Sequence, residues 1–455
     1  MVEASAGSGD GTVAVAVDEE AAKERAFRAL LLNTLLSGVT SSFLWFALTF
    51  WVYLESRSVV ATAMIGAAFS LSSAVLSPAF GSYVDRHRKH QAMTLATTVS
   101  ATCISLATVV FLTVDAEQLL RMGGPSFWLL VSLTLFGSVA GSLRGIALST
   151  CVTLLVAEAR RDRANGLVGT VSGVSFAITS LFSGLVIGRL GMGWAFYITL
   201  VITVAVLAHL RTIHIAEAAP VPVEGESTAH IDVRGAIDAI RVVPGLSMLI
   251  ALAAFNNLLG GVFMALMDAY GLSLVSVETW GLLWAFIMLA FIVGGLAVAR
   301  FGLGKVPVRL VVIGNLVNWV VCATFTLRSS IVLLGLGCFV WLLMMPVIEA
   351  AEQTVLQRAI PFERQGRVFG FAQMIENAAS PLTAVFIGPM AEVVFMPLMT
   401  DGRGADWIGS WFGTGPERGL ALVFTLAGLV GIVVTALFRW SRSYRSLTAV
   451  PVAVP

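Results

Sequence analysis

The sequence has few charged residues and few cysteines. Asp, Glu, Lys and Arg make up 12% of its 455 residues, whereas soluble chains carry about 25%. The formal net charge is +1, and no Lys/Arg-rich domain suggests nucleic-acid binding. All four cysteines fall inside apolar stretches: Cys103, Cys151, Cys322 and Cys338. They are therefore predicted to be small buried side chains and not disulfides or a metal cluster.

Motifs for catalysis and for ATP use are also missing. There is no Walker-type glycine loop, so ATP is not predicted as an energy source. Neither zinc-ligand spacing nor a nucleophile–base arrangement occurs. We therefore expect no enzymatic activity, no cofactor and no metal site. The first ~20 residues, which end in Asp18-Glu19-Glu20, lack the basic segment of a secretory signal. Residues 1–26 are predicted to be a disordered cytoplasmic tail.

What the chain has is a series of long apolar stretches. Apolar residues make up 57% of the sequence, and the mean hydropathy is +0.89. A helix rises ~1.5 Å per residue, so about 20 apolar residues cross a ~30 Å hydrocarbon core. The pattern predicts an all-α membrane protein of twelve transmembrane helices. They are expected at residues 27–54, 59–80, 91–114, 127–157, 164–188, 193–211, 246–272, 279–300, 306–327, 331–353, 368–397 and 419–440.

Positive charge alternates between the connections of these helices. Twenty-one Lys and Arg residues fall in one alternating set and six in the other. Positive loops stay cytoplasmic, so both termini and the linker are predicted to lie inside a cytoplasmic membrane. The predicted divisions are a tail at 1–26, an N-terminal half at 27–211, a linker at 212–245 with a short helical pattern near 231–243, a C-terminal half at 246–440 and a tail at 441–455.

The two halves carry traces of one repeat. Gly81-Ser82-Tyr83-Val84-Asp85-Arg86 follows the second predicted helix, and Gly295-Leu296-Ala297-Val298-Ala299-Arg300 follows the eighth. The glycine-to-arginine spacing is the same, and the acid is absent from the second copy. Two pseudo-symmetric six-helix halves around a midplane site are typical of a secondary transporter.

The loop after the second helix resembles the signature of the major facilitator superfamily. It reads Gly81-x-x-x-Asp85-Arg86-x-Arg88-Lys89, although the usual glycine two residues after the arginine is Arg88. The resemblance covers about residues 27–440. The run from Pro346 through Glu349 and Glu352 to Gly366-Arg367-Val368-Phe369 resembles the exporter branch that includes macrolide efflux proteins and the enterobactin exporter.

The resemblance implies a cytoplasmic gate built around Asp85. That carboxylate would accept hydrogen bonds near Arg367, at the start of the eleventh helix, where the helix dipole favours an anion. Glu158 would pair with Arg88 or Lys89. The predicted gate comprises Gly81, Asp85, Arg86, Arg88, Lys89, Glu158 and Arg367. The alternative is that these charges serve only to orient the loops.

Arg144 lies in the middle of the fourth predicted helix. A mid-helix arginine costs at least ~2.5–3.5 kcal/mol on insertion scales, so it usually faces a cavity or a partner. The resemblance places this helix at the central cavity and implies a proton-linked role. The alternative is a structural pair between two helices.

Three acids are the other candidates for coupling to protons. Glu376 lies in the eleventh helix, where it is either a coupling group or a hydrogen-bonded structural acid. Glu349 and Glu352 are three residues apart and share one face of the tenth helix, which favours a solvated gate face. The first helix has no acid, so coupling would use Arg144 with Glu376 or Glu349.

Four further residues are candidates for the substrate pathway. Asn256 and Asn257 lie at membrane depth in the seventh helix, where amides line cavities or join helices. Trp45 and Met344 would form an adaptable apolar wall for a bulky ligand, and helix packing is the alternative for each.

These observations predict a secondary transporter that exports amphiphilic small molecules by alternating access. Proton antiport is the expected energy source, and multidrug resistance the expected phenotype of such efflux. The expected partners are the substrate, protons and the lipid bilayer, and the protein is expected to be a monomer. The alternatives are a siderophore exporter and a transporter of lipids or lysolipids.

Overall fold

The computed structural model describes residues 9–56, 59–121, 124–217 and 231–449. Within these ranges the chain forms helices and no strand. The long helices of the N-terminal half are α1 (Gly9–Ser56), α2 (Val59–Arg86), α3 (Lys89–Thr113), α5 (Pro125–Leu155), α6 (Arg161–Arg189) and α7 (Met192–Thr212). Those of the C-terminal half are α9 (Leu246–Leu274), α10 (Val277–Phe301), α11 (Pro307–Thr324), α12 (Ile331–Ala359), α13 (Gln365–Met390) and α16 (Pro416–Trp440).

These twelve long helices confirm the predicted all-α fold. Among the described residues, 10 helical segments are long and apolar enough to cross a membrane. The remaining long helices, α2 and α6, are of similar length and contain many small and polar residues. Both pack against the opposite half, α2 on α13 and α6 on α10. Small residues let helices approach closely in a membrane, which fits the position of α2 and α6 at the interface between the halves.

Short helices occupy the connections. They are α4 (Ala116–Leu120), η1 (Glu158–Arg160), α8 (Val233–Val242), η2 (Phe362–Arg364), the π-helical η3 (Ala391–Phe395), α14 (Met396–Thr400), α15 (Arg403–Phe412) and α17 (Arg442–Thr448). Helix α8 confirms the short helical pattern predicted in the linker. The linker is described at residues 212–217 and 231–245, and its middle lies outside the described residues.

The N-terminal segment differs from its prediction. Helix α1 begins at Gly9, so residues 9–26 are helical where a disordered tail is predicted, and residues 1–8 lie outside the described part. Ion pairs one turn apart support this extension: Lys23 Nζ lies 2.7 Å from Glu19, and Arg28 lies 2.5 Å from Glu24. Such pairs at i and i+4 stabilise an exposed helix.

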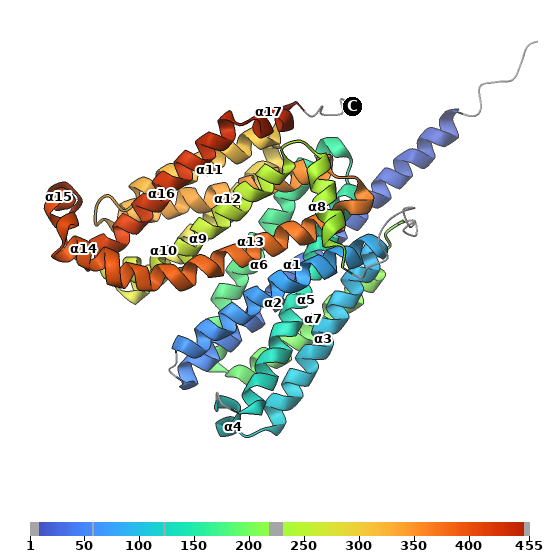
Figure 1. Ribbon diagram of the computed structural model, residues 1–455. Helices are drawn as coiled ribbons and strands as arrows, with labels where there is room; N and C mark the ends of the chain where they lie inside the picture. The colour runs from blue at the N-terminus through green and yellow to red at the C-terminus, as the bar shows by residue number, and fades with distance from the viewer. Residues whose placement is uncertain (1–8, 57–58, 122–123, 218–230, 450–455) are drawn as a thin grey trace, which may run out of the picture.

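The two halves pack together mainly at one end. One cluster of buried apolar side chains includes Leu30 and Leu148 of the N-terminal half with Leu252 and Val368 of the C-terminal half. The two other clusters each belong to a single half. The helices accordingly converge near α8 and diverge towards the ends that carry α4 and α15 (Figure 1). We call the converged end, which carries the Arg-rich connections, the latch end.

Candidate functional site

Asp85 joins the two halves at the latch end. It lies near the end of α2, and 7% of the residue is exposed. Its Oδ1 accepts a hydrogen bond from Gly366 N at 2.6 Å, and its Oδ2 accepts from Arg367 N at 3.0 Å and Arg367 Nε at 2.9 Å. The first amides of a helix lack partners within the helix and attract an anion. Asp85 therefore caps the N-terminus of α13 across the interface.

The linker takes part in the same group of contacts. Arg367 Nη1 lies 2.8 Å from Asp232 Oδ2, so one guanidinium contacts carboxylates of both α2 and the linker. Asp232 N donates to Ser82 Oγ at 3.0 Å, and Asp232 Oδ1 accepts from Gly235 N, which caps α8. Asp232 thus ties the linker to both halves.

Lys89 pairs with the linker and not with Glu158. Its Nζ lies 3.3 Å from Glu217 Oε1, and the exposed fractions of the two side chains are 2% and 4%. Its backbone N donates to Glu217 Oε2 at 2.7 Å, and its ammonium lies 4.5 Å from the ring centre of Phe362. Glu158 lies in η1, where its charge interacts with Arg161. The prediction is that Glu158 pairs with Arg88 or Lys89. In the described part of the chain Glu158 makes neither ion pair, and Lys89 pairs with Glu217 instead.

The remaining predicted gate residues lie around this group. Arg86 is the last residue of α2, and Arg88 is the exposed residue that precedes α3. Gly81 lies where α2 meets α13 so closely that an added Cβ would overlap the backbone of Gly366. The structure thus brings Gly81, Asp85 and Arg367 into direct contact.

A second set of contacts joins α6 to the C-terminal half. Asp162 Oδ2 accepts from Leu303 N, just after α10, at 2.8 Å. A Cβ added at Gly295 would lie 2.7 Å from Thr170 N. Gly295 therefore permits close packing of α10 on α6, as Gly81 permits close packing of α2 on α13. The second repeat lacks the acid, and the polar contact on this side comes from Asp162 of α6, which the sequence analysis did not identify.

Buried amides extend this second set, and they too were not anticipated. Asn165 Nδ2 donates to Thr354 Oγ1 and Gln357 Oε1, both at 2.9 Å. Gln357 Nε2 in turn donates to Ser149 O at 3.0 Å. Among the described residues, the hydrogen bond between halves that lies farthest from the latch end joins Asn377 to Ser73 at 3.1 Å. Bonding between the halves is therefore concentrated at one end.

The three candidate acids lie together in the C-terminal half. The charge of Glu352 interacts with those of Glu349 and Glu376, which also interact with each other. Glu349 is exposed, Glu352 and Glu376 are half-buried, and Glu352 Oε1 has no hydrogen-bond partner. Glu349 also lines a cavity of about 70 Å³ between the halves, opposite Ser149 and Ser172. The sequence analysis placed Glu349 and Glu352 on one helix face, and the fold brings Glu376 to them.

Arg144 is held by neutral groups of its own half. It is 5% exposed, and its Nη1 donates to Thr97 Oγ1 of α3 at 3.1 Å. Its Nη2 donates to Asn33 Oδ1 of α1, while Nε has no partner. Asn33 Nδ2 in turn donates to Val206 O at 2.9 Å and lies 3.2 Å from His209 Nδ1.

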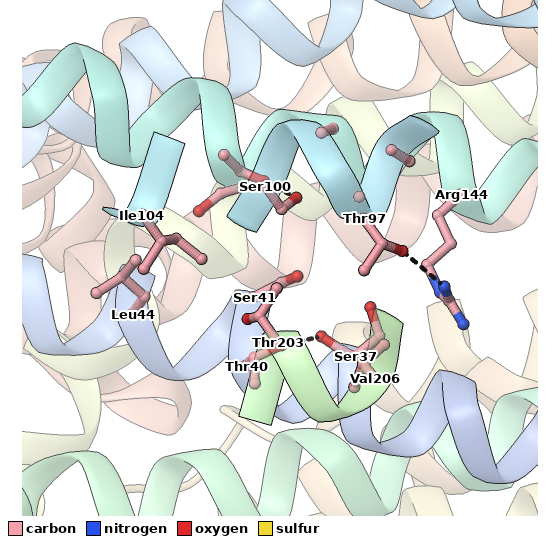
Figure 2. A pocket seen from close by; sticks show the side chains of 15 residues that line it. Ser37, Thr40, Ser41, Leu44, Thr97, Ser100, Ile104, Arg144, Thr203 and Val206 are labelled. Atoms are coloured by element: carbon pink, nitrogen blue, oxygen red, sulfur yellow. Dashed lines mark hydrogen bonds between the residues drawn. The ribbon is translucent and has the colours of Figure 1, made fainter. Parts of the chain in front are cut away.

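Figure 2 shows Arg144 at the edge of a small pocket lined with hydroxyl groups, including Ser37, Ser41 and Ser100. No carboxylate of the described chain lies within ion-pair distance of the guanidinium. In this conformation Arg144 therefore makes no ion pair with Glu376 or Glu349, the acids with which it is expected to share a role in coupling. A set of neutral acceptors compensates the buried charge instead.

The other candidate pathway residues do not form one site. Asn256 Oδ1 accepts from Trp319 Nε1 at 3.2 Å, and Asn257 Nδ2 donates to Ala253 O at 3.1 Å. Trp45 lies against Phe69, with ring centres 4.9 Å apart. Met344 packs beside the apolar cluster of the latch end. Trp45 and Met344 therefore make helix-packing contacts, as the alternative for each predicted. Asn256 joins two helices of the C-terminal half, α9 and α11.

Comparisons with known proteins agree with this architecture. The family model described as Major Facilitator Superfamily matches residues 30–384. Macrolide efflux protein A of Streptococcus pyogenes is 21% identical over 370 residues, which cover 78% of this chain and 87% of that protein.

Two solved structures share the fold. The human organic anion transporter MFSD10 (TETRAN) has a TM-score of 0.66 at 14% identity, with 91% of this chain and 99% of that chain covered. A bacterial homologue of the iron transporter ferroportin in an outward-facing state has a TM-score of 0.65 at 18% identity, with 91% and 100% covered.

Proposed function

Because the chain belongs to the Major Facilitator Superfamily, we propose that it exports amphiphilic small molecules by alternating access, with proton antiport as the energy source. The family assignment makes it a multi-pass membrane transporter and not an enzyme. The similarity to a macrolide efflux protein over most of both chains supports export. Macrolides are bulky amphiphiles, so they indicate the class of substrate to test.

The observation that carries this proposal is the unequal bonding of the halves. Asp85, Asp232, Asp162 and Gln357 all make contacts at the latch end, and two apolar clusters farther away each stay within one half. Breaking a small set of polar contacts at one end, while new contacts form at the other, converts one access state into the other. The present conformation is the one closed at the latch end.

The three grouped acids support proton coupling. Glu349 lies ten residues before the end of α12, which corresponds to about 15 Å of helix. An exposed carboxylate at such depth faces water within the bundle, because facing lipid is costly. Neighbouring carboxylates resist simultaneous ionisation, so a proton or a cationic substrate stabilises the group. In this proposal Glu349, Glu352 and Glu376 release protons when substrate binds and take them up when it leaves. Arg144 holds α1, α3 and α5 together beside the substrate path.

Transport by the purified protein in liposomes tests the proposal. Uptake of a radiolabelled macrolide and of a cationic amphiphilic dye would be measured with and without an imposed pH gradient, together with substrate-induced proton movement reported by an enclosed pH-sensitive dye. We expect transport of at least one compound, coupled to counterflow of protons. Glu352→Gln and Glu376→Gln should uncouple the two fluxes, while Glu363→Gln, an exposed acid of η2, should not.

These measurements test proton coupling and the class of substrate separately. Transport that ignores the pH gradient, with unchanged fluxes in Glu352→Gln and Glu376→Gln, would refute proton coupling through these acids. Transfer of a fluorescent lysolipid between leaflets, with no movement of the dye or macrolide, would identify a lipid transporter instead.

The latch end is proposed to be cytoplasmic, as are both termini. Ser446 lies in α17 at this end. A cysteine placed there should resist impermeant thiol reagents in intact cells and react after the cells are opened. The same is expected at position 227 of the linker, which lies outside the described residues. Efficient labelling in intact cells would reverse the orientation.

A further inference from the structure

A groove of about 590 Å³ lies between the N-terminal extension of α1 and the ends of α5 and α6. Its α1 side includes Lys23, Phe27 and Arg28, and its other side includes Arg161 and Arg163. The groove lies at the latch end and is lined only by α1, α5, η1, α6 and the turn between α5 and η1. It lies next to Asp162, which contacts the C-terminal half, and apart from the three acids.

The groove has a surplus of positive charge. Its three acids are already paired: Glu19 with Lys23, Glu24 with Arg28 and Glu20 with Arg160. Arg161 and Arg163 have no carboxylate within ion-pair distance among the described residues, and the charge of Glu158 acts on Arg161 from farther away. Arg161 donates to Val156 O at 3.3 Å and Thr153 O at 3.2 Å, which keeps its guanidinium at the groove wall. Arg163 is exposed, so a ligand in the groove has access to its guanidinium.

The position of the groove matches the level of lipid headgroups. Helix α1 has 48 residues, about 72 Å at ~1.5 Å per residue, and exceeds the ~40–45 Å of a whole bilayer. Its extension therefore passes beyond the apolar core, as Figure 1 shows by the free end of α1. The groove lies where the apolar part of α1, from Phe27 onward, begins.

Apolar surface continues from the groove towards the membrane. Leu154, Leu155 and Leu167 line the groove. Leu167 of α6 and Leu32 of α1 are 36% and 53% exposed, on two helices that pack against each other. A ligand with an anionic head and apolar chains would place the head on the arginines and the chains along this exposed surface.

We propose that this groove binds the phosphate headgroup of an anionic phospholipid. Arg161 and Arg163 contact the phosphate, and the acyl chains follow Leu32 and Leu167. Arginine suits this role because its planar guanidinium donates two parallel hydrogen bonds to phosphate oxygens. The Glu20–Arg160 pair crosses the groove, and its carboxylate competes with the phosphate for the positive charge.

Lipid binding to the purified full-length protein tests this proposal. Binding of dioleoyl phosphatidylglycerol would be measured by native mass spectrometry and by the shift in thermal stability in detergent, with dioleoyl phosphatidylcholine and inorganic phosphate as comparisons. We expect phosphatidylglycerol to bind at least fivefold more tightly than phosphatidylcholine. Inorganic phosphate at the same concentration should neither bind nor displace it, because it lacks the acyl chains.

Variants distinguish this groove from a general attraction of charge. Arg163→Gln should weaken phosphatidylglycerol binding at least threefold, and Arg161→Gln/Arg163→Gln should weaken it further. Glu20→Gln should strengthen binding, because it releases Arg160 to the lipid. Arg403→Gln, an exposed arginine of α15 far from the groove, should leave it unchanged.

Two outcomes would overturn the assignment. One is equal phosphatidylglycerol binding by the wild-type protein, Arg163→Gln and Glu20→Gln. The other is full displacement of the lipid by inorganic phosphate, which would make the groove a site for the free anion. Glu20→Gln alters only exposed groups, so it remains informative even if Arg161→Gln, which loses contacts to α5, fails to fold.

Discussion

Arg367 Nη1 lies 2.8 Å from Asp232 Oδ2, and this ion pair attaches the linker to the first turn of α13. The exposed fractions of the two side chains are 7% and 9%, so the pair is largely shielded from water. The linker is therefore part of the gate as well as a connection between the halves, and opening the latch end separates Asp232 from Ser82 or from Arg367.

Asp232→Asn should favour opening of the latch end. The amide can still cap α8, but it removes the negative charge that faces Arg367. Loss of one partner of a buried pair costs ~3–5 kcal/mol, reduced here because Arg367 keeps Asp85. Spin labels at the exposed Ala159 and Glu363, on opposite halves, should move farther apart. Asp238→Asn, an exposed acid of α8, is the control, and equal distances in both variants would exclude a role for the linker.

Asp85→Asn should reduce transport at least tenfold while leaving expression and substrate affinity largely intact. Asp85 accepts three hydrogen bonds from Gly366 and Arg367, and charge-assisted bonds contribute ~1.5–3 kcal/mol each. Asparagine keeps the size of the side chain but has one acceptor oxygen. Turnover in liposomes measures the effect. Wild-type turnover would show that the loop only orients the protein in the membrane.

Gly295→Ala should hinder closure of the latch end through the second repeat. The added Cβ would lie 2.7 Å from Thr170 N, and because that atom is backbone, α6 and α10 must separate. We expect greater reactivity of a cysteine at Gln357, which is 2% exposed, and transport reduced several-fold. Gly188→Ala, in open space on α6, should behave like the wild type. Normal closure in Gly295→Ala would show that the helices adjust without cost.

Arg144→Lys should impair transport, and Arg144→Ala should impair it more. Lysine keeps the charge but cannot reach Thr97 and Asn33 with separate nitrogens of a planar fork. If the role is purely structural, thermal stability will fall in step with transport in both variants. If it is proton-linked, the dependence of transport on the pH gradient will change at unaltered stability. Arg189→Lys, at an exposed site on α6, serves as the control. A stable and fully active Arg144→Ala would assign coupling to the three acids alone.

Much of the fold is predictable because hydropathy acts locally. The apolar stretches at 246–272 and 331–353 correspond to α9 at Leu246–Leu274 and α12 at Ile331–Ala359. Bilayer thickness imposes the length of each span. The N-terminal extension of α1 was not predicted, because a search for apolar stretches does not detect a polar helix. This helix is supported by charge pairs one turn apart.

The sequence by itself determined the twelve long helices and their division into two halves, because both follow from residues close together in the chain, and the family resemblance pointed to Gly81 and Asp85. Only the tertiary structure decided the partners of the buried charges. Asp232 meets Arg367 across 135 residues, and Asn33 meets Arg144 across 111. A buried charge takes whichever acceptors the packing of helices brings within about 3 Å, and hydropathy does not encode that choice.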